Sequence, residues 1–381
     1  MLSTDATLTY PELVRQTCKT LVERSADHVQ INQAGIDDFL NNLDLSRFRK
    51  LSKGWINFPL KFDTPEDEVN LVALVDLLNF GSGFRAELHR ATGRGASQTI
   101  LFGCMGMYIG QVPLSAEGMS KAHLADVATY FGIPLLGEEV PHPTIPALTI
   151  SEPSPLRALA QQITDVLQET GTILKEQGYR SLGHFILEAT RKPEYAPANW
   201  RPSAAELVRR LVKAFPSFQD YRVVDDHPDV YLLKRAQLLA ADLRDRFVGT
   251  NSPVAAQFDF SDMAQLTVFA DNVLPTVLDH FQILKITDVA LIEKLEQKTP
   301  VTADEMWLLR AAAVVGAEQI VARGHQLAAE CAGPESPRAA HYTTLAEMLN
   351  PVALDHYLWH IGKDESIRKR ERLVYKDTVY F

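Results

Sequence analysis

The chain has 381 residues, of which 46% are hydrophobic and 23% charged, a composition typical of a globular protein with a large core. The net charge of −10 argues against general binding of duplex DNA or RNA, whose affinity comes mainly from lysine and arginine on phosphates. It leaves room for a mononucleotide, which needs only one local cationic pocket. Three widely spaced cysteines predict no disulfide framework, and the apolar runs are too short for a signal peptide or a membrane span. We therefore expect a reduced, cytoplasmic protein that does not contact a membrane.

Helical periodicity dominates the chain. Residues 69–78 and 159–174 repeat apolar side chains at the three- and four-residue spacing of an amphipathic helix. Serine or threonine followed by proline, or followed three residues later by glutamate, is typical of a helix N-terminus. Pro11 opens one helical run, and the other predicted starts are Thr64, Ser154, Ser203 and Thr302.

Few segments predict β-structure. Residues 221–224 and 230–233 are rich in β-branched and aromatic side chains and flank a polar stretch, which is typical of a hairpin. Residues 373–375 and 378–381 have the composition of short edge strands. The sequence therefore predicts a mainly α, multi-helical fold with a minor β-hairpin or small sheet.

A proline-rich segment divides the sequence. Residues 141–155 contain five prolines, and each proline fixes its own backbone and lacks a hydrogen-bond donor. The segment is therefore the best candidate for a linker. We expect an N-terminal helical lobe over residues 1–140 and a C-terminal lobe over residues 156–381.

Asp271 follows a short apolar run at residues 266–270, so its carboxylate is expected at the edge of buried surface. One interpretation is an N-terminal cap for a helix over residues 272–280, with Pro275 tolerated in the first turn. The other is a carboxylate that faces a ligand. The two are compatible, because a cap at the edge of a cleft also faces whatever binds there.

Lys234 and Arg235 lie where the hairpin is expected to run into a helix. Cations at a helix N-terminus oppose the helix dipole unless an anion lies there too. A phosphate group meets that need, because free backbone N–H groups and a cation together form an anion site. The alternative is a solvated pair close to Asp242 or Asp245.

Asp355 and Trp359 are four residues apart and so share one face of a helix. A carboxylate beside an aromatic ring suits a heterocyclic base that is stacked and hydrogen-bonded at its edge. The alternative is a core tryptophan with a surface aspartate. Histidine, cysteine and glutamate nowhere have the spacing of a zinc site, so the sequence predicts no metal.

These segments, in this order, resemble the queuosine salvage protein family, N-glycosylases that release the modified base queuine from queuosine 5′-phosphate. The family's Lys-Arg-Ala-Gln motif recurs at residues 234–237, and its Phe-Ala-Asp motif recurs at residues 269–271. The resemblance implies that Asp271 is the catalytic carboxylate. It also implies that Lys234, with Arg235 beside it, contacts the phosphate or the ribose.

The resemblance assigns further residues to substrate binding. A similar Leu-Asp-x-x-x-Trp stretch points to Asp355 and Trp359, and Phe269 belongs to the Phe-Ala-Asp motif. Asn79 and Phe80 match a third family segment.

The third segment also departs from the family pattern. Many members have bulky aromatic residues directly after the equivalent of Phe80. Here residues 81–83 are Gly-Ser-Gly, and an aromatic residue, Phe84, comes only afterwards. The chain therefore either uses Phe84 in their place or has a different pocket, which leaves the substrate open.

The resemblance implies a helical, DNA-glycosylase-like architecture in which both lobes form one family unit. It further implies hydrolysis of an N-glycosidic bond in a small-molecule nucleotide, with no cofactor and no polymeric nucleic acid as partner. A 7-deazapurine has no N7 to protonate, so an acid must act at another edge of the leaving base, and the sequence does not identify it. Two alternatives stay open: a hydrolase of the same fold with a different base substrate, and a non-catalytic helical binding or scaffold protein.

Overall fold

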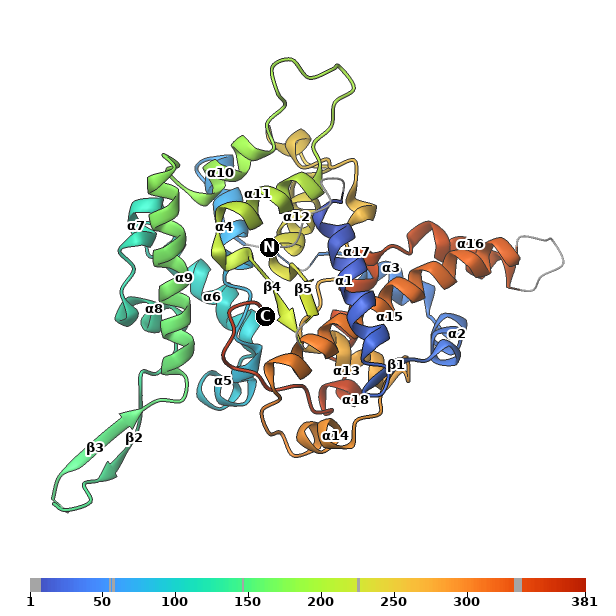
Figure 1. Ribbon diagram of the computed structural model, residues 1–381. Helices are drawn as coiled ribbons and strands as arrows, with labels where there is room; N and C mark the ends of the chain where they lie inside the picture. Colours follow the sequence, from blue (N-terminus) through green and yellow to red (C-terminus); the bar gives the residue numbers. More distant parts are fainter. Residues whose placement is uncertain (1–7, 55, 57–58, 146, 225–226, 332–337) are drawn as a thin grey trace.

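The computed structural model describes residues 8–54, 56, 59–145, 147–224, 227–331 and 338–381. This part of the chain contains eighteen α-helices and six short strands (Figure 1). In chain order, the helices are α1 (Tyr10–Arg24), α2 (Gln33–Asn41), α3 (Leu45–Leu51), α4 (Pro65–Leu77), α5 (Arg85–Thr92), α6 (Ala96–Ile109), α7 (Ala116–Ser120), α8 (Leu124–Phe131), α9 (Arg157–Glu176), α10 (Leu182–Ala189), α11 (Ala204–Ala214), α12 (Lys234–Phe247), α13 (Val273–His280), α14 (Val289–Glu296), α15 (Ala303–Glu330), α16 (Ala339–Met348), α17 (Pro351–Ile361) and α18 (Glu365–Arg368). The strands are β1 (Val29–Ile31), β2 (Leu136–Pro141), β3 (Thr149–Pro153), β4 (Tyr221–Val224), β5 (His227–Tyr231) and β6 (Leu284–Ile286). The predicted mainly α fold is confirmed.

The predicted helix starts are confirmed because they rest on local hydrogen bonds. Thr64 and Thr302 each form a capping box with the acidic residue three positions later, at the starts of α4 and α15. Ser203 caps α11 by accepting a hydrogen bond from the Glu206 N–H at 3.0 Å. Pro11 lies in the first turn of α1, and α9 begins three residues after Ser154.

The strands form three antiparallel pairs, β1–β6, β2–β3 and β4–β5. The pair β4–β5 is the predicted hairpin, and residues 225–226 of its turn lie outside the described residues. The pairing of β1 with β6 was not predicted, since strands of three residues are too short to show an alternating pattern.

The prediction of edge strands at residues 373–375 and 378–381 is wrong, because this segment is irregular. Its hydrogen bonds join loops and not a sheet. The Gly81 N–H donates to the Phe381 carbonyl at 2.9 Å, and the Val301 N–H donates to the Val374 carbonyl at 3.1 Å.

One cluster of buried apolar side chains extends from Val14 to Phe381, so it includes residues of both predicted lobes. Helix α1 packs against α15, and α4 packs against α10 and α12. The proline-rich segment contributes β3 and part of β2 to a hairpin that projects between α8 and α9 (Figure 1). The division into two lobes stays a prediction.

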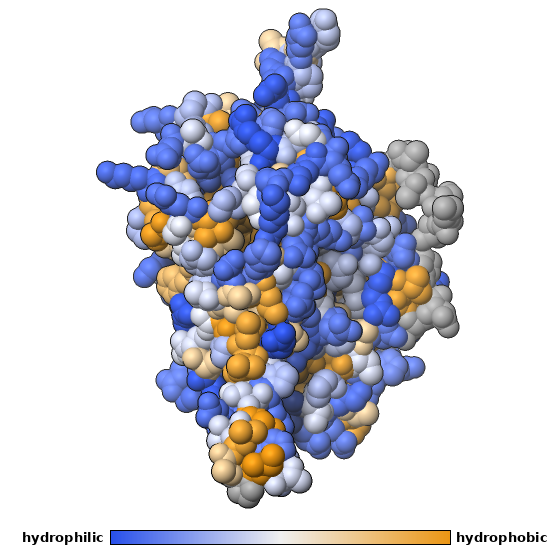
Figure 2. Space-filling model, turned by 90° about the vertical axis from the view of Figure 1, so that its left-hand side faces the viewer, coloured by the Kyte–Doolittle hydropathy of each residue, from blue (hydrophilic) through white to orange (hydrophobic). Residues whose placement is uncertain are grey.

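The projecting hairpin carries an apolar surface, visible as the orange area at the lower end of Figure 2. Leu136, Val140, Ile145 and Leu148 are all exposed there. Among the described residues, no helix combines the length and the apolar composition that crossing a bilayer requires.

Candidate active site

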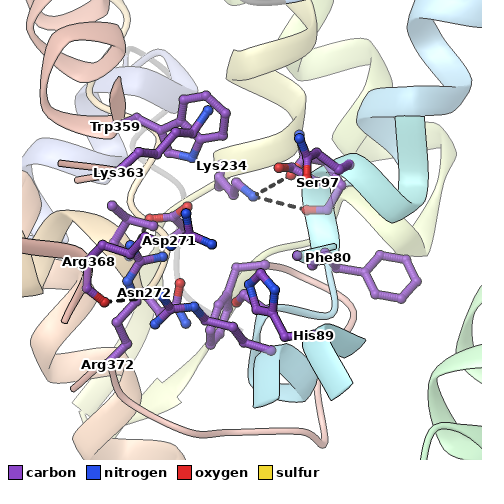
Figure 3. Close-up of a pocket in the computed structure, with 18 residues that line it drawn as sticks. Phe80, His89, Ser97, Lys234, Asp271, Asn272, Trp359, Lys363, Arg368 and Arg372 are labelled. Carbon is purple, nitrogen blue, oxygen red and sulfur yellow. Dashed lines mark hydrogen bonds between the residues drawn. The ribbon is translucent and has the colours of Figure 1, made fainter. Parts of the chain in front are cut away.

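A cavity of about 210 Å³, here called the outer cavity, lies between segments that are far apart in the sequence (Figure 3). Its walls come from residues 79–98, the start of α12, residues 271–273, and residues between Trp359 and Phe381. A smaller space of about 20 Å³, here called the inner cavity, shares four wall residues with it. The shared residues are Asn79, Lys234, Asp271 and Trp359. The inner cavity therefore adjoins the outer one behind Asp271.

Asp271 caps α13 and also lines both cavities. Its Oδ1 accepts hydrogen bonds from the Val273 N–H at 2.7 Å and the Leu274 N–H at 3.3 Å, so the capping interpretation is confirmed. Within the described part of the chain, its Oδ2 accepts no hydrogen bond. The side chain is thus fixed through one oxygen, while the other lies at the cavity without a protein donor among the described residues.

Lys234 lies beside Asp271 at the start of α12, and only 5% of it is exposed. Its Nζ donates to the Asn79 carbonyl at 2.9 Å and to Asn79 Oδ1 at 3.0 Å, the dashed lines in Figure 3. Burial lowers the pKa of Lys234 to about 8, and the Asp271 carboxylate partly opposes that shift. The alternative of a solvated lysine–arginine pair is wrong, because both side chains are buried.

Arg235 points to the other side of α12 and lines neither cavity. Its guanidinium donates hydrogen bonds to the carbonyls of Leu77 and Ser217. It also lies over the rings of Phe80 and Phe218, at 5.4 and 5.7 Å from their centroids. Arg235 therefore supports the cavity wall from behind.

A buried ion pair that the sequence did not reveal connects these elements. Arg310 on α15 donates to both oxygens of Asp220, at 3.0 and 2.7 Å, and its Nε donates to the Ala270 carbonyl at 2.8 Å. Asp220 Oδ2 also accepts from the backbone N–H of Lys234 at 3.1 Å. The pair therefore holds the start of α12 and the residue before Asp271 together. An arginine within the apolar run of α15 is the signal that could have indicated it.

Besides Lys234 and Asp271, which it shares with the outer cavity, the inner cavity is lined by two titratable side chains that burial keeps neutral at pH 7, Asp355 and His356. Burial raises the pKa of Asp355 to about 8, although its Oδ1 accepts a hydrogen bond from the Phe269 N–H at 2.7 Å. Burial likewise lowers the pKa of His356 to about 4. Asp355 is 4% exposed, so the alternative of a surface aspartate is wrong, and Trp359 lies at the boundary of both cavities.

The Gly-Ser-Gly sequence at residues 81–83, which departs from the family pattern, has a structural reason. Gly81 has a φ of +91°, and a Cβ at Gly83 would lie 2.1 Å from the Tyr375 carbonyl oxygen, so the C-terminal segment packs where only glycine fits. Asn79 and Phe80 line the outer cavity. Phe84 is buried beneath Lys376 and lines neither cavity.

The outer cavity also contains basic side chains that sequence reasoning missed, because they are scattered along the chain. They are Arg85, His89, Lys363, Arg368 and Arg372. Together with Asp271 they give the cavity one carboxylate and several cations.

Fold and cavity together describe a multi-helical protein with a ligand-sized cavity that combines a capped aspartate, a buried lysine and an aromatic wall. The chain belongs to the queuosine salvage protein family, whose family model matches residues 149–380.

Relatives named queuosine 5′-phosphate N-glycosylase/hydrolase support this membership. The chain is 34% identical over 168 residues to the protein of Sphaerobacter thermophilus, a match that covers 42% of this chain and only 46% of that protein. It is 25% identical over 314 residues to the Bos taurus protein, covering 79% and 77% of the two chains. It is 29% identical over 222 residues to the Nematostella vectensis protein, covering 57% of each.

Proposed function

We propose that this protein hydrolyses the N-glycosidic bond of queuosine 5′-phosphate, or of a related 7-deazaguanine nucleotide, and releases queuine for salvage into tRNA modification. The observation that carries the proposal is the position of Asp271, whose Oδ1 caps α13 and whose Oδ2 accepts no hydrogen bond within the described residues. It lies between the basic outer cavity and the inner cavity that Asp355 and Trp359 line. The family match and the names of the relatives support the same reaction. The partner is then a small-molecule nucleotide in the cytoplasm, and not polymeric nucleic acid or a membrane.

Asp271 acts on the ribose in this proposal. Cleavage of an N-glycosidic bond builds positive charge at C1′ and negative charge on the departing base. A carboxylate next to C1′ stabilises that positive charge, and it either activates water or attacks C1′ directly. Overall, water supplies a hydroxyl to C1′ and a proton to the base. Lys234, which lies beside Asp271, orients the ribose.

Asp355 acts on the base. With a pKa of about 8 it is protonated at neutral pH, so it supplies the hydrogen-bond donor that a 7-deazapurine needs at an edge other than position 7. In this proposal the base stacks on the side of the Trp359 ring opposite Lys363, whose Nζ lies 3.3 Å from the ring centroid. Phe269 fixes Asp355 through its backbone N–H. Two aspartates in different surroundings thus have different roles, as in other enzymes that pair a carboxylic acid with a carboxylate.

The test is base release from purified protein, followed by mass spectrometry. The substrates are queuosine 5′-phosphate, queuosine, and the 5′-phosphates of guanosine and adenosine. Release of queuine from queuosine 5′-phosphate by the wild type, and not by Asp271→Asn, is the expected result. Release of another base only would favour a hydrolase of different specificity. Binding of all four without release would favour a non-catalytic binding protein.

A further inference from the structure

The outer cavity contains a group of cations that the reaction described above does not use. They are Arg85, Lys363, Arg368 and Arg372, with His89 among them, and within the described residues none of them forms an ion pair with a carboxylate. Asp271 is the one carboxylate side chain among the described residues that line this cavity, so positive charge exceeds negative charge there although the chain as a whole has a net charge of −10.

These side chains disfavour one another's charge. Burial and then Arg85 and Arg368 lower the pKa of His89. Burial and then Arg372 lower the pKa of Lys363 to about 8. An anion placed among them would remove this repulsion.

Arg372 has an unused donor. Its Nη2 donates to the Gly362 carbonyl at 2.8 Å, but its Nε is buried and donates to no acceptor within the described residues. A buried charged donor without an acceptor costs free energy, so such groups are rare unless a ligand completes them.

A helix N-terminus faces the same space. Helix α6 has fourteen residues, and its N-cap is Gly95, which has no side chain to accept a hydrogen bond. In the described structure the backbone N–H groups of Ala96, Ser97 and Gln98 donate to no acceptor, and all three residues line the outer cavity. Free N–H groups at the positive end of a helix dipole, next to cations, form an anion-binding site.

We propose that the start of α6, together with Arg85, Lys363 and Arg372, binds the 5′-phosphate of the substrate. This subsite rests on the proposed function and specifies which end of the nucleotide lies where. The phosphate lies in the outer cavity at α6, and C1′ lies at Asp271. The base lies along Trp359 with its edge directed at Asp355, because the inner cavity of about 20 Å³ admits no more than the edge of a ring. Lys234 contacts the ribose and not the phosphate, because two of its three protons already go to Asn79.

The first experiment compares Arg85→Gln with Arg90→Gln. Both arginines are on α5, but Arg90 is exposed and does not line the cavity. The readout is the ratio of kcat/KM for queuosine 5′-phosphate to kcat/KM for queuosine. We expect Arg85→Gln to lower this ratio by about ten- to a hundredfold, the range for a hydrogen bond to a charged group, and Arg90→Gln to leave it unchanged.

The second experiment removes a backbone donor. Ala96→Pro eliminates one N–H at the first position of α6, where proline is well tolerated, and Gly95 already has the extended backbone that precedes proline (φ −87°, ψ 176°). Gln33→Pro makes the same change at the start of α2, away from the cavity, and is the matched control. We expect Ala96→Pro alone to weaken binding of inorganic phosphate, measured by calorimetry, by about tenfold. A 3′-phosphate of the nucleoside is expected to lack the advantage of the 5′-phosphate.

The outcomes separate the two proposals. If the wild type releases queuine but the substrate ratio and phosphate binding stay unchanged in Arg85→Gln and Ala96→Pro, the subsite is wrong and the function stands. If these variants lose phosphate binding while the wild type releases no base from any substrate, the anion site stands and the function is wrong.

Discussion

The outer and inner cavities differ in the charge of the side chains that line each of them alone. At the outer end, Arg85, Lys363 and Arg372 keep access to solvent and carry positive charge at neutral pH. At the inner end, burial leaves both Asp355, with a pKa of about 8, and His356, with a pKa of about 4, uncharged at pH 7.

The difference follows from solvation. A charge near water keeps most of its hydration, whereas a fully buried group lowers its free energy by becoming neutral. The outer end is therefore suited to an anion and the inner end to the uncharged edge of a heterocycle, with Asp271 between them. The variants that follow change either the inner cavity or the residues between the two cavities.

Asp271→Asn changes the residue between the two cavities and has the largest expected effect on turnover. Asparagine also caps helices well, so the melting temperature should stay near that of the wild type. Turnover of the nucleotide should fall by about a hundredfold to ten-thousandfold, the range for a positioned acid–base group. Near-normal turnover in steady-state assays would remove Asp271 from the mechanism.

Arg310→Leu breaks the Arg310–Asp220 ion pair, which holds the start of α12 and the residue before Asp271 together. It leaves Asp220 buried without its partner, and breaking a buried pair in this way costs about 3–5 kcal/mol of stability. Urea denaturation measures this loss. Leu309→Met, on the same buried helix, is the control and should cost less than about 1.5 kcal/mol. A similar small loss for both variants would show that the pair contributes little.

Trp359→Ala tests the inner end. If the indole stacks on the base, binding of free queuine should weaken by about 1–3 kcal/mol, the range for base–aromatic stacking. Phosphate binding at the outer end should change less. Unchanged affinity for the base in a folded variant would assign Trp359 to packing alone.

Asp355→Asn tests whether Asp355 is protonated at neutral pH, through the pH dependence of the free energy of unfolding. The folded-state pKa of about 8 lies above the ordinary value of 3.8, so the folded protein binds this proton more tightly than the unfolded chain. The resulting contribution to the free energy of unfolding is complete below about pH 4 and is lost as pH rises through about 8, by at most about 1.4 kcal/mol per unit.

The measurement is therefore a difference between the wild type and Asp355→Asn over pH 5–9. Asp76 and Asp242 contribute in the same direction, because burial raises their pKa values too, and they remain in both proteins. The variant should show a shallower fall in stability and a smaller decline in activity near pH 8, where Lys234 and Lys363, with pKa values of about 8, still titrate. Parallel curves for the two proteins would contradict protonation of Asp355.

Several features of the protein were predictable because they depend on neighbours within a few residues. The capping boxes at Thr64 and Thr302 and the cap at Ser203 fix helix starts locally. The N–H groups that Asp271 accepts from are two and three residues away, so its capping role was also visible in the sequence. The family motifs at residues 234–237 and 269–271 identified two segments that line the cavities.

Other features depend on how distant segments meet, and no local pattern encodes them. Lys234 and Arg235 are adjacent, yet the first faces Asp271 and the second is buried against Leu77 and Ser217, because successive helical residues point in different directions. Arg85 and Arg372 are far apart in the sequence and meet only because the C-terminal segment packs over Gly83. The sequence alone determined the helix starts at Thr64, Ser203 and Thr302 and the carboxylate at the head of α13. The tertiary structure decided which charges surround that carboxylate, because burial and proximity, which set the charge of each group, arise only when the whole chain has packed.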